Sequence, residues 1–543
     1  MHGMSSGTAH EAGDVVGAGL EGEDAAPRQR YPVGMLTRCA PLLLLMPLVT
    51  AQEGSDQLRA FLEGGPHVAS DGSALELLPL TLEQAVELAL RANLDLERAA
   101  VEVEVAQAGA RGAWGTFDWD LTGTVSYSSD ERPGSNVFEA GSIESEARNG
   151  NLSLRRALST GGSFAVDFNV NNTETTSPFA VGDRFTRDGL SMSFTQPLAR
   201  GAWREYATAT QRERELEWTR TVESRRGSRQ DLVRRVQLAY WELVAAGEQW
   251  TVSVSSLELG LELLAKRERE LEAGIGTEVE VLQAQAEVAT RLEAGLLARN
   301  ELQKRADDLK LVVLGDPASE LWTRALVAET GLPPQVDASD VPSWADAMLV
   351  ALENRSDLRV QRVEVETARL GLLRAESERL AGVDLEVSAS SNGQSTDPSQ
   401  ALDDTLGFEF PGWSVRLTYN VPIGNRTANQ AVIAAEGRVR LARIDQQRSE
   451  MAAVAEVRDA VRQVRYRAEA VRAAEASLRL AELQLEAEQA RYDEGLSTNF
   501  QVLEFQRDLV EARRGERQAR VEYVKARTQL LAAQGLLDGE RAQ

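Results

Sequence analysis

Side chains that could carry out enzymatic chemistry are scarce in this 543-residue chain. Its one cysteine is Cys39, and its histidines are His2, His10 and His67. A cysteine–histidine zinc site needs three or four such ligands, and a nucleophilic serine or cysteine needs a base beside it. His67 alone cannot meet either need, and we interpret it as a surface histidine. The sequence therefore predicts no catalytic residue, no metal and no cofactor. The many acidic residues do not exclude an enzyme that uses carboxylates alone, but no phosphate-binding loop or active-site motif supports one.

The formal net charge of the chain is −25 at pH 7. Proteins that bind nucleic acid usually present a basic stripe to the phosphate backbone. The acidic balance therefore argues against a nucleic-acid partner, and also against attachment to anionic lipid by charge.

The N-terminal residues have the pattern of an export signal. Arginines precede the apolar stretch Cys39–Val49, which is too short to span a bilayer, and Ala51 ends a small-residue cleavage site. We expect residues 1–51 to be a signal peptide with an N-terminal extension, and residues 52–80 to be an N-terminal linker. No later apolar run approaches about 18 residues. A membrane role then requires either a closed β-barrel or surface attachment.

The elements that would position a functional site occur twice. Leu82–Leu96 recurs as Trp344–Leu358, with Thr81 and Ser343 before them as plausible helix N-caps. Glu270–Thr277 likewise recurs as Arg491–Thr498. In both copies of this second motif a helical pattern stops at glycine, which suits a left-handed C-cap, and restarts after threonine. The same order in both halves indicates an internal duplication.

We divide the chain accordingly into a first repeat (81–315), an inter-repeat segment (316–342), a second repeat (343–536) and a C-terminal tail (537–543). Each repeat is expected to contain, in order, a helix (Leu82–Trp114; Trp344–Arg379), a β region (116–195; 383–421), a very long helix (Trp203–Ala273; Arg426–Glu494) and a shorter helix (Glu278–Leu314; Asn499–Leu536). A helix of about 70 residues is about 105 Å long, and the two shorter helices stacked end to end would match it. Taken alone, the long helices would favour a cytosolic coiled coil.

The β regions favour a different setting. Phe117–Tyr127, Phe164–Asn171 and Trp413–Tyr419 alternate apolar and polar residues, as strands of a transmembrane barrel do. We expect exposed loops at 128–151, 173–189 and 391–405. The alternative interpretation is a small antiparallel sheet in a soluble cap.

Four to six strands cannot close a barrel, for which about eight is the practical minimum. Several copies must therefore pool strands, and three copies with four strands each would give twelve. The first β region also contains an extra hairpin within 151–171, with a turn at Ser159–Gly162. The sequence leaves open whether this hairpin adds strands to the barrel or folds outside it.

With these features the chain resembles the TolC-like outer-membrane efflux protein family, over residues 80–536. The resemblance rests on the two opening helices, on the strand exits Thr195–Gly201 and Asn420–Gly424, and on the two glycine–threonine reversals. It implies a mainly α fold in which duplicated units form an α-helical periplasmic barrel and a transmembrane β-barrel shared by a homotrimer. It also implies contact with outer-membrane lipid, a periplasmic adaptor (membrane fusion protein) and an inner-membrane pump.

The resemblance also implies where the site lies. In that family the reversals form the periplasmic tip, and acidic residues just after them surround the closed aperture. The matching aperture positions here are Glu278, Glu280, Gln501 and Glu504. The expected adaptor contacts are Gly274, Ile275, Gly276, Thr277, Gly495, Leu496, Ser497 and Thr498. Alternatively, the acidic residues are solvated residues near a helix N-terminus, where the dipole favours them.

The sequence thus predicts a passive trimeric channel, gated at its periplasmic tip, that serves as the outer-membrane exit duct of a tripartite efflux or type I secretion system. We do not expect an enzyme. The alternative function is a periplasmic coiled-coil scaffold or envelope tether without a pore.

Overall fold

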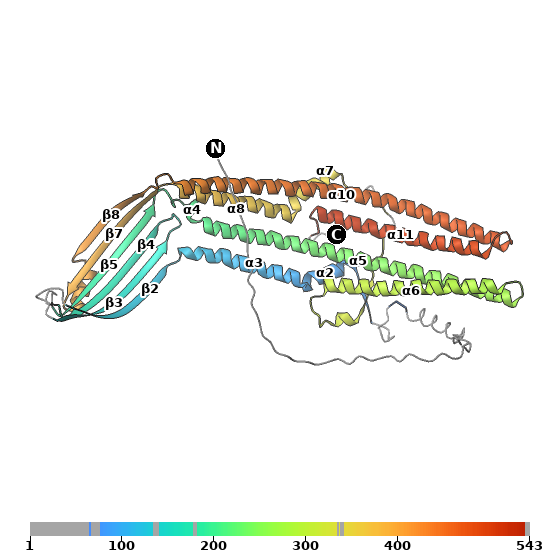
Figure 1. The fold of residues 1–543 in the computed structure, drawn as a ribbon, viewed down its shortest axis with the longest axis horizontal. Coiled ribbons are helices and arrows are strands. Elements are labelled where there is room, and N and C mark those ends of the chain that lie inside the picture. Colours follow the sequence, from blue (N-terminus) through green and yellow to red (C-terminus); the bar gives the residue numbers. More distant parts are fainter. Residues whose placement is uncertain are drawn as a thin grey trace, which may run out of the picture. The chain divides into compact units, whose positions relative to one another are not determined.

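The computed structural model describes residues 65–66, 76–133, 141–177, 182–333, 336 and 341–537. The predicted signal peptide, Cys39, the three histidines, most of the linker and most of the C-terminal tail lie outside these residues. Contacts divide the chain into residues 1–57 and a unit spanning Leu58–Gln543, which contains everything described below. In this unit, long helices run side by side and an antiparallel sheet adjoins one end of them (Figure 1).

The two long helices of the duplicated pattern are present. They are α5 (Ala209–Glu272) and α10 (Arg426–Asp493), and each reverses into a shorter partner, α6 (Glu278–Val313) and α11 (Asn499–Ala533). Helix α6 packs along the part of α5 that lies farther from the sheet, and α11 packs along the corresponding part of α10 (Figure 1). A single turn, α4 (Arg204–Ala207), precedes α5 and is separated from it by Thr208, so the expected helix Trp203–Ala273 is interrupted near its start.

Each expected opening helix is also broken in two. The first repeat has α2 (Leu82–Ala92) and α3 (Leu94–Ala113), and the second has α7 (Trp344–Asn354) and α8 (Ser356–Arg379). Asn93 has extended backbone, and its side chain accepts hydrogen bonds from the amides of Asp95 and Leu96, which starts a new helix.

Arg355 interrupts the second repeat at the equivalent place. It also has extended backbone, and its guanidinium pairs with Asp357 at 2.9 Å and Glu456 at 2.6 Å. The predicted N-caps Thr81 and Ser343 are confirmed, since both side chains accept a backbone amide at the helix start.

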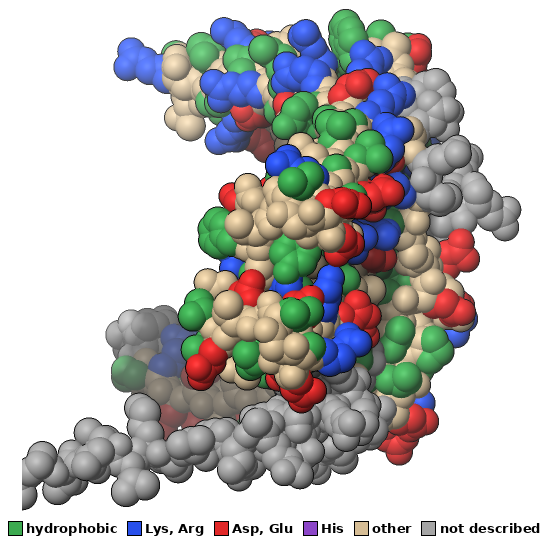
Figure 2. All heavy atoms as spheres, turned by 90° about the vertical axis from the view of Figure 1, so that its right-hand side faces the viewer, with side chains coloured by type: hydrophobic (Ala, Val, Ile, Leu, Met, Phe, Trp, Pro, Cys, Tyr) green, Lys and Arg blue, Asp and Glu red, His purple; other side chains and the backbone are tan. Residues whose placement is uncertain are grey.

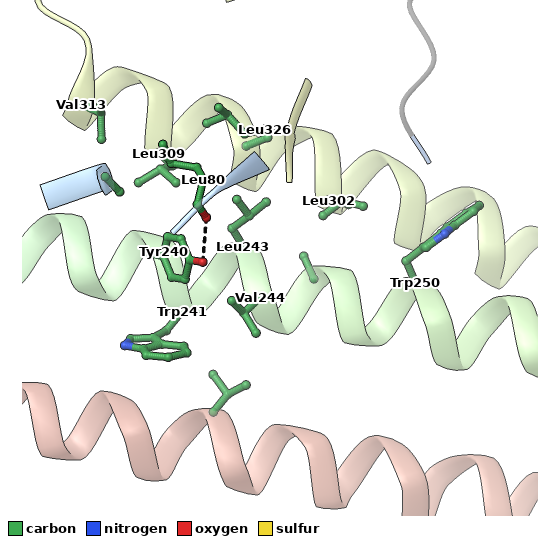
Figure 3. Close-up of a cluster of buried hydrophobic side chains, with 14 of the residues drawn as sticks. Leu80, Tyr240, Trp241, Leu243, Val244, Trp250, Leu302, Leu309, Val313 and Leu326 are labelled. Carbon is green, nitrogen blue, oxygen red and sulfur yellow. Dashed lines mark hydrogen bonds between the residues drawn. The ribbon is translucent and has the colours of Figure 1, made fainter. Parts of the chain in front are cut away.

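The helices form four neighbouring columns. Near the sheet, α3 contacts α5, α5 contacts α8, and α8 contacts α10; farther from it, α5 contacts α11 between the two reversing pairs (Figure 1). A cluster of buried apolar side chains holds the columns together where α2, α5, α6 and α11 meet (Figure 3). There the Tyr240 hydroxyl donates a 2.9 Å hydrogen bond to the Leu80 carbonyl. Leu80 ends β1 (Leu77–Leu80), which pairs in parallel with β6 (Ala325–Ala328) and so joins the start of the first repeat to the inter-repeat segment. Short 3₁₀ turns lie at Trp114–Phe117 and Glu320–Thr323.

The β regions of both repeats form one six-stranded antiparallel sheet. Its strands are β2 (Asp120–Pro133), β3 (Ser142–Ala157), β4 (Ser163–Thr175), β5 (Arg184–Pro197), β7 (Gly382–Ser395) and β8 (Pro411–Asn420). Their spatial order is β2-β3-β4-β5-β7-β8. The extra hairpin therefore adds β3 and β4 to the sheet. Within the described residues, β2 and β8 each have a free edge and the sheet does not close on itself.

The strands are longer than the sequence predicted, so the expected loops at 128–151, 173–189 and 391–405 are too wide. Strands β2 and β3 pair from Asp120 opposite Arg155 to Pro133 opposite Ser142. The outer parts of these strands are polar on both faces and carry no apolar period, although their backbone ladder continues. The third expected loop instead contains the end of β7 and the short helix α9 (Pro398–Leu406), which Asp397 caps.

The register gives the sheet one apolar and one polar face, because residues paired across antiparallel strands point to the same side. The apolar face carries Leu121, Val125, Tyr127, Leu152, Leu154, Phe164, Val166, Phe168, Leu190, Met192, Phe194, Leu385, Val387, Trp413, Val415, Leu417 and Tyr419. The polar face carries Thr122, Thr124, Ser126, Asn149, Asn151, Asn169, Asn171, Ser191, Ser193, Ser388, Ser390, Ser414 and Thr418. This is the two-sided composition that a transmembrane barrel wall requires.

Helix α9 packs on the outer end of the apolar face. A side chain at Gly393 would place its Cβ 1.9 Å from the carbonyl oxygen of Ala401, so only glycine allows the helix to lie this close. The Thr405 hydroxyl lies 3.3 Å from the carbonyl oxygen of Asp188 on β5. The helix therefore covers the polar end of that face, where the apolar residues stop.

Candidate functional site at the helix reversals

Both reversals lie at the end of the helices opposite the sheet (Figure 1). The backbone φ angle is +76° at Gly274 and +74° at Gly495, the left-handed conformation that favours glycine. Thr277 and Thr498 then cap α6 and α11 through hydrogen bonds from the backbone amides three residues later. The glycine C-caps and threonine N-caps predicted from the repeated motif are confirmed.

Two of the four aperture candidates serve as helix caps. The Glu280 carboxylate accepts hydrogen bonds from the backbone amide and the hydroxyl of Thr277, both at 2.9 Å. These two hydrogen bonds lower the pKa of Glu280 below its usual value, and the bond from the amide has the larger effect. The Gln501 side chain accepts the Thr498 amide at 3.2 Å in the same way. This capping-box geometry gives a local reason for Glu or Gln at these positions.

The other two candidates, Glu278 and Glu504, are exposed near the first turns of α6 and α11. The structure thus brings all four side chains to one end of the unit, but it turns Glu280 and Gln501 back onto the helix starts. A role at an aperture stays a prediction for all four.

The expected adaptor contacts include two exposed apolar side chains at matching positions. Ile275 is 80% exposed in the first reversal, and Leu496 is 71% exposed in the second. Val279 and Phe500, in the first turns of the helices that follow, are also more than 60% exposed. Figure 2 faces this end and shows hydrophobic and acidic side chains beside one another. Exposed apolar residues on a reversal give a protein partner something to bury.

A buried arginine behind the reversals joins the two helical pairs. Arg267 on α5 is 2% exposed, and its guanidinium donates to the Tyr492 hydroxyl of α10 and, at 2.7 Å, to Asn499 of α11. It also lies over the Tyr492 ring, 4.6 Å from the centroid, and pairs with Glu270 at 2.5 Å. We refer to Arg267, Glu270, Tyr492 and Asn499 as the Arg267 cluster. Sequence reasoning missed it, because the partners of Arg267 on α10 and α11 are more than 200 positions away.

A second cluster, whose Glu287 and Arg291 are buried and whose Arg507 is exposed, lies farther from the tip. Glu287 of α6 pairs with Arg291 of the same helix at 3.0 Å and with Arg507 of α11. Arg291 also donates to the Ser256 carbonyl of α5 at 2.8 Å and to Gln506 of α11 at 3.2 Å. We refer to these residues as the Glu287 cluster. Like the Arg267 cluster, it ties the α5/α6 pair to the other helical pair.

Burial alone would raise the pKa of Glu287, but hydrogen bonds from Arg507 and Arg291, together with their charges, outweigh it. The pKa of Glu287 is therefore held below its usual value. The carboxylate stays charged at neutral pH, and so the cluster stays intact.

The two lateral sides of the unit expose apolar side chains in rows. One side carries Leu94, Val101, Val105, Val279, Leu282, Leu297 and Leu311 on α3 and α6; the other carries Ile433, Leu441, Met451, Tyr466, Leu480 and Leu483 on α10. These rows continue toward the free edges of β2 and β8 on the same two sides. Exposed apolar side chains aligned along one side of a helix are typical of a protein interface.

No group of three or more His, Cys, Asp or Glu side chains among the described residues is arranged to hold a metal ion. None of the described helices combines the length and hydropathy needed to cross a membrane.

The fold is similar to the folds of solved outer-membrane channels. It superposes on the outer-membrane channel OprN with a TM-score of 0.62 and 17% identity, covering 84% of this chain and 89% of that one. It also superposes on VceC of Vibrio cholerae with a TM-score of 0.59 and 18% identity, covering 84% and 96%.

Sequence comparison points in the same direction. Residues 349–536 match the family described as outer membrane efflux protein. The chain is also 25% identical to outer membrane protein TolC of Vibrio cholerae over 357 residues, which are 64% of this chain and 76% of TolC. Both matches agree with the resemblance noted in the sequence.

Proposed function

We propose that three copies of this chain form a passive exit duct across the outer membrane and the periplasm. The observation that carries this proposal is a sheet that has an apolar face and two free edges. The helical layer that continues from this sheet also exposes apolar side chains on both of its sides. In lipid, each unpaired backbone group costs several kcal/mol. One copy therefore cannot complete a wall, and pairing β8 of one copy with β2 of the next removes both edges.

The two unsatisfied sides differ from each other, since one presents α3, α6 and β2 and the other presents α10 and β8. Contact between unlike surfaces is head-to-tail, and such contacts close into rings when the rotation allows. In this assembly the apolar rows of α3 and α6 pack against that of α10. The two repeats, 81–315 and 343–536, then contribute alternating pairs of columns to a single wall.

We assign the gate to the reversal end. The Arg267 and Glu287 clusters hold the α5/α6 and α10/α11 pairs together behind it, so opening requires these clusters to loosen or rearrange. A periplasmic adaptor that buries Ile275 and Leu496 would supply the energy for that change, and an inner-membrane pump would supply that for transport. Exposed Glu278 and Glu504, repeated by the three copies, would surround the opening and concentrate cations.

Planar-bilayer conductance of the purified protein tests this proposal. The double variant E278Q/E504Q removes the two exposed charges per copy and leaves the Glu280 and Gln501 caps intact. We expect cation selectivity to fall while the protein still inserts and conducts; E436Q, on the exposed part of α10 near the sheet, serves as control. Unchanged selectivity would remove the aperture assignment. A protein that forms no pore and leaves membranes without detergent would instead be the periplasmic scaffold.

A further inference from the structure

We propose that the outer-membrane wall of the assembled channel has eighteen strands, six from each copy, and not twelve. This inference rests on the proposed trimer. It arises from the β3–β4 hairpin, which the structure places inside the sheet, between the strand that follows α3 and the strand that precedes α4 and α5.

The hairpin is paired on both sides along its length. Strand β3 pairs with β2 from Arg155 to Ser142, and β4 pairs with β5 from Ser163 to Glu174. Side chains join across both boundaries and within the hairpin, as when Asn149 donates to the Ser126 hydroxyl at 3.5 Å. Extruding the hairpin would break two complete ladders and leave β2 to find a new partner.

The faces of the hairpin continue those of the other four strands. Leu152, Leu154, Phe164, Val166 and Phe168 extend the apolar face, whereas the asparagines of β3 and β4 extend the polar face. A hairpin that folded back over the sheet would set polar amides against lipid or apolar rings against water. When the hairpin lies in the plane of the sheet, its apolar face meets lipid and its polar face meets water.

The hairpin turn is fixed to the junction between sheet and helices. The Thr160 hydroxyl donates to the Gln196 side chain at 2.9 Å, and Gln196 donates back to the Thr160 carbonyl at 3.1 Å. The turn also packs against the strand exit, since a Cβ at Gly161 would lie 2.3 Å from the carbonyl oxygen of Gly201. These contacts hold the turn in line with the neighbouring strands.

Wall widths agree with six strands per copy. Four packed helix columns occupy about 32–40 Å, at about 8–10 Å per column. Strands about 4.8 Å apart and tilted by about 40° occupy about 6.3 Å of circumference each. Six strands therefore span about 38 Å, whereas four span only about 25 Å by the same rule. With the hairpin included, the strand layer is as wide as the helical layer that feeds it.

An eighteen-strand wall changes what the channel can pass. Barrel diameter grows roughly in proportion to strand number, and barrels of 16–18 strands enclose an aqueous channel. The lining here consists largely of amide and hydroxyl side chains from the polar face. The outer-membrane section would then be no narrower than the helical duct and suited to bulky hydrophilic cargo.

Disulfide trapping in isolated outer membranes tests the strand number. In a C39S background, we pair S126C with N149C across β2 and β3, and A165C with S193C across β4 and β5. Directly opposed residues of antiparallel strands have the Cα separation that a disulfide needs. S388C/S414C across β7 and β8, whose hydroxyls lie 2.8 Å apart, is the control that does not involve the hairpin.

We expect both hairpin pairs to form disulfides to the same extent as the control, in the species that native mass measurement identifies as the trimer. Failure of the hairpin pairs where the control forms would overturn the eighteen-strand wall and leave the trimer standing. A disulfide in T124C/S191C, which joins β2 to β5, would also overturn it. Absence of any trimer would instead reject the proposed function itself.

Discussion

At the scale of single residues, the Arg267 cluster is one of the polar contacts that join the helical pairs behind the tip. A buried guanidinium is stable only when its charge and donors are paired, and removing one partner of a buried ion pair costs about 3–5 kcal/mol. The charge of Arg267 is paired with Glu270 of α5, and its two terminal nitrogens donate to Tyr492 of α10 and Asn499 of α11, while its Nε has no hydrogen-bond partner among the described residues. The contact therefore links local stability at the tip to the separation of the helical pairs.

Replacing Arg267 tests this link. We expect R267A to raise hydrogen exchange in the last turns of α5 and α10 about 100-fold or more, because a cost of about 3 kcal/mol corresponds to that factor. We also expect it to increase the time that the pore spends open. R269A is the matched control, since Arg269 is exposed and its guanidinium donates to the Ala265 carbonyl of its own helix. Equal exchange in the two variants would show that Arg267 does not hold the tip together.

Glu287 makes the same region sensitive to acid. Its folded pKa lies below the usual value, so the stabilisation it provides is complete above the unfolded pKa of about 4.5 and is lost as pH falls through the folded pKa. We expect the α6–α11 contact to exchange amide hydrogens faster below about pH 4.5, and E287Q to be fast already at pH 7. A wild-type contact that stays equally protected at pH 7 and pH 3.5 would contradict this.

At the scale of elements, the two reversals depend on the same pair of devices: a left-handed glycine and a threonine cap. Loss of such a cap costs about 1 kcal/mol. We expect T277A and T498A each to speed exchange in the first turn of the following helix by about fivefold. T290A, whose hydroxyl bonds within the exposed middle of α6, should have little effect. A similar change in all three variants would show that the effect is not capping.

The repeated reversals could be predicted because glycine and threonine act through their immediate neighbours. The breaks at Asn93 and Arg355 could not, since an asparagine within an apolar period gives no sign that its side chain will cap a new helix. The strand ends were misplaced because residues polar on both faces lose the period of two while the ladder continues. The Arg267 and Glu287 clusters depend on which helices become neighbours, and this information is absent from any local pattern.

At the scale of the whole molecule, the two faces of the sheet should respond differently to charge. Val125 is 91% exposed on the apolar face, and its neighbour Thr124 points to the polar face. An arginine on the lipid face of a barrel costs about 2–4 kcal/mol near the midplane. We expect V125R to reduce assembled protein in the outer membrane strongly, and T124R to assemble normally. Equal assembly of the two variants would place both residues in water.

The account depends most on the claim that sister copies complete the wall that one copy leaves open. Electron cryo-microscopy of the full-length protein in lipid nanodiscs measures this directly. We predict three copies around one axis, with β8 of each copy paired to β2 of the next and with the six strands of each copy in the bilayer. A single copy, or a sheet whose β2 and β8 edges stay unpaired in water, would contradict it.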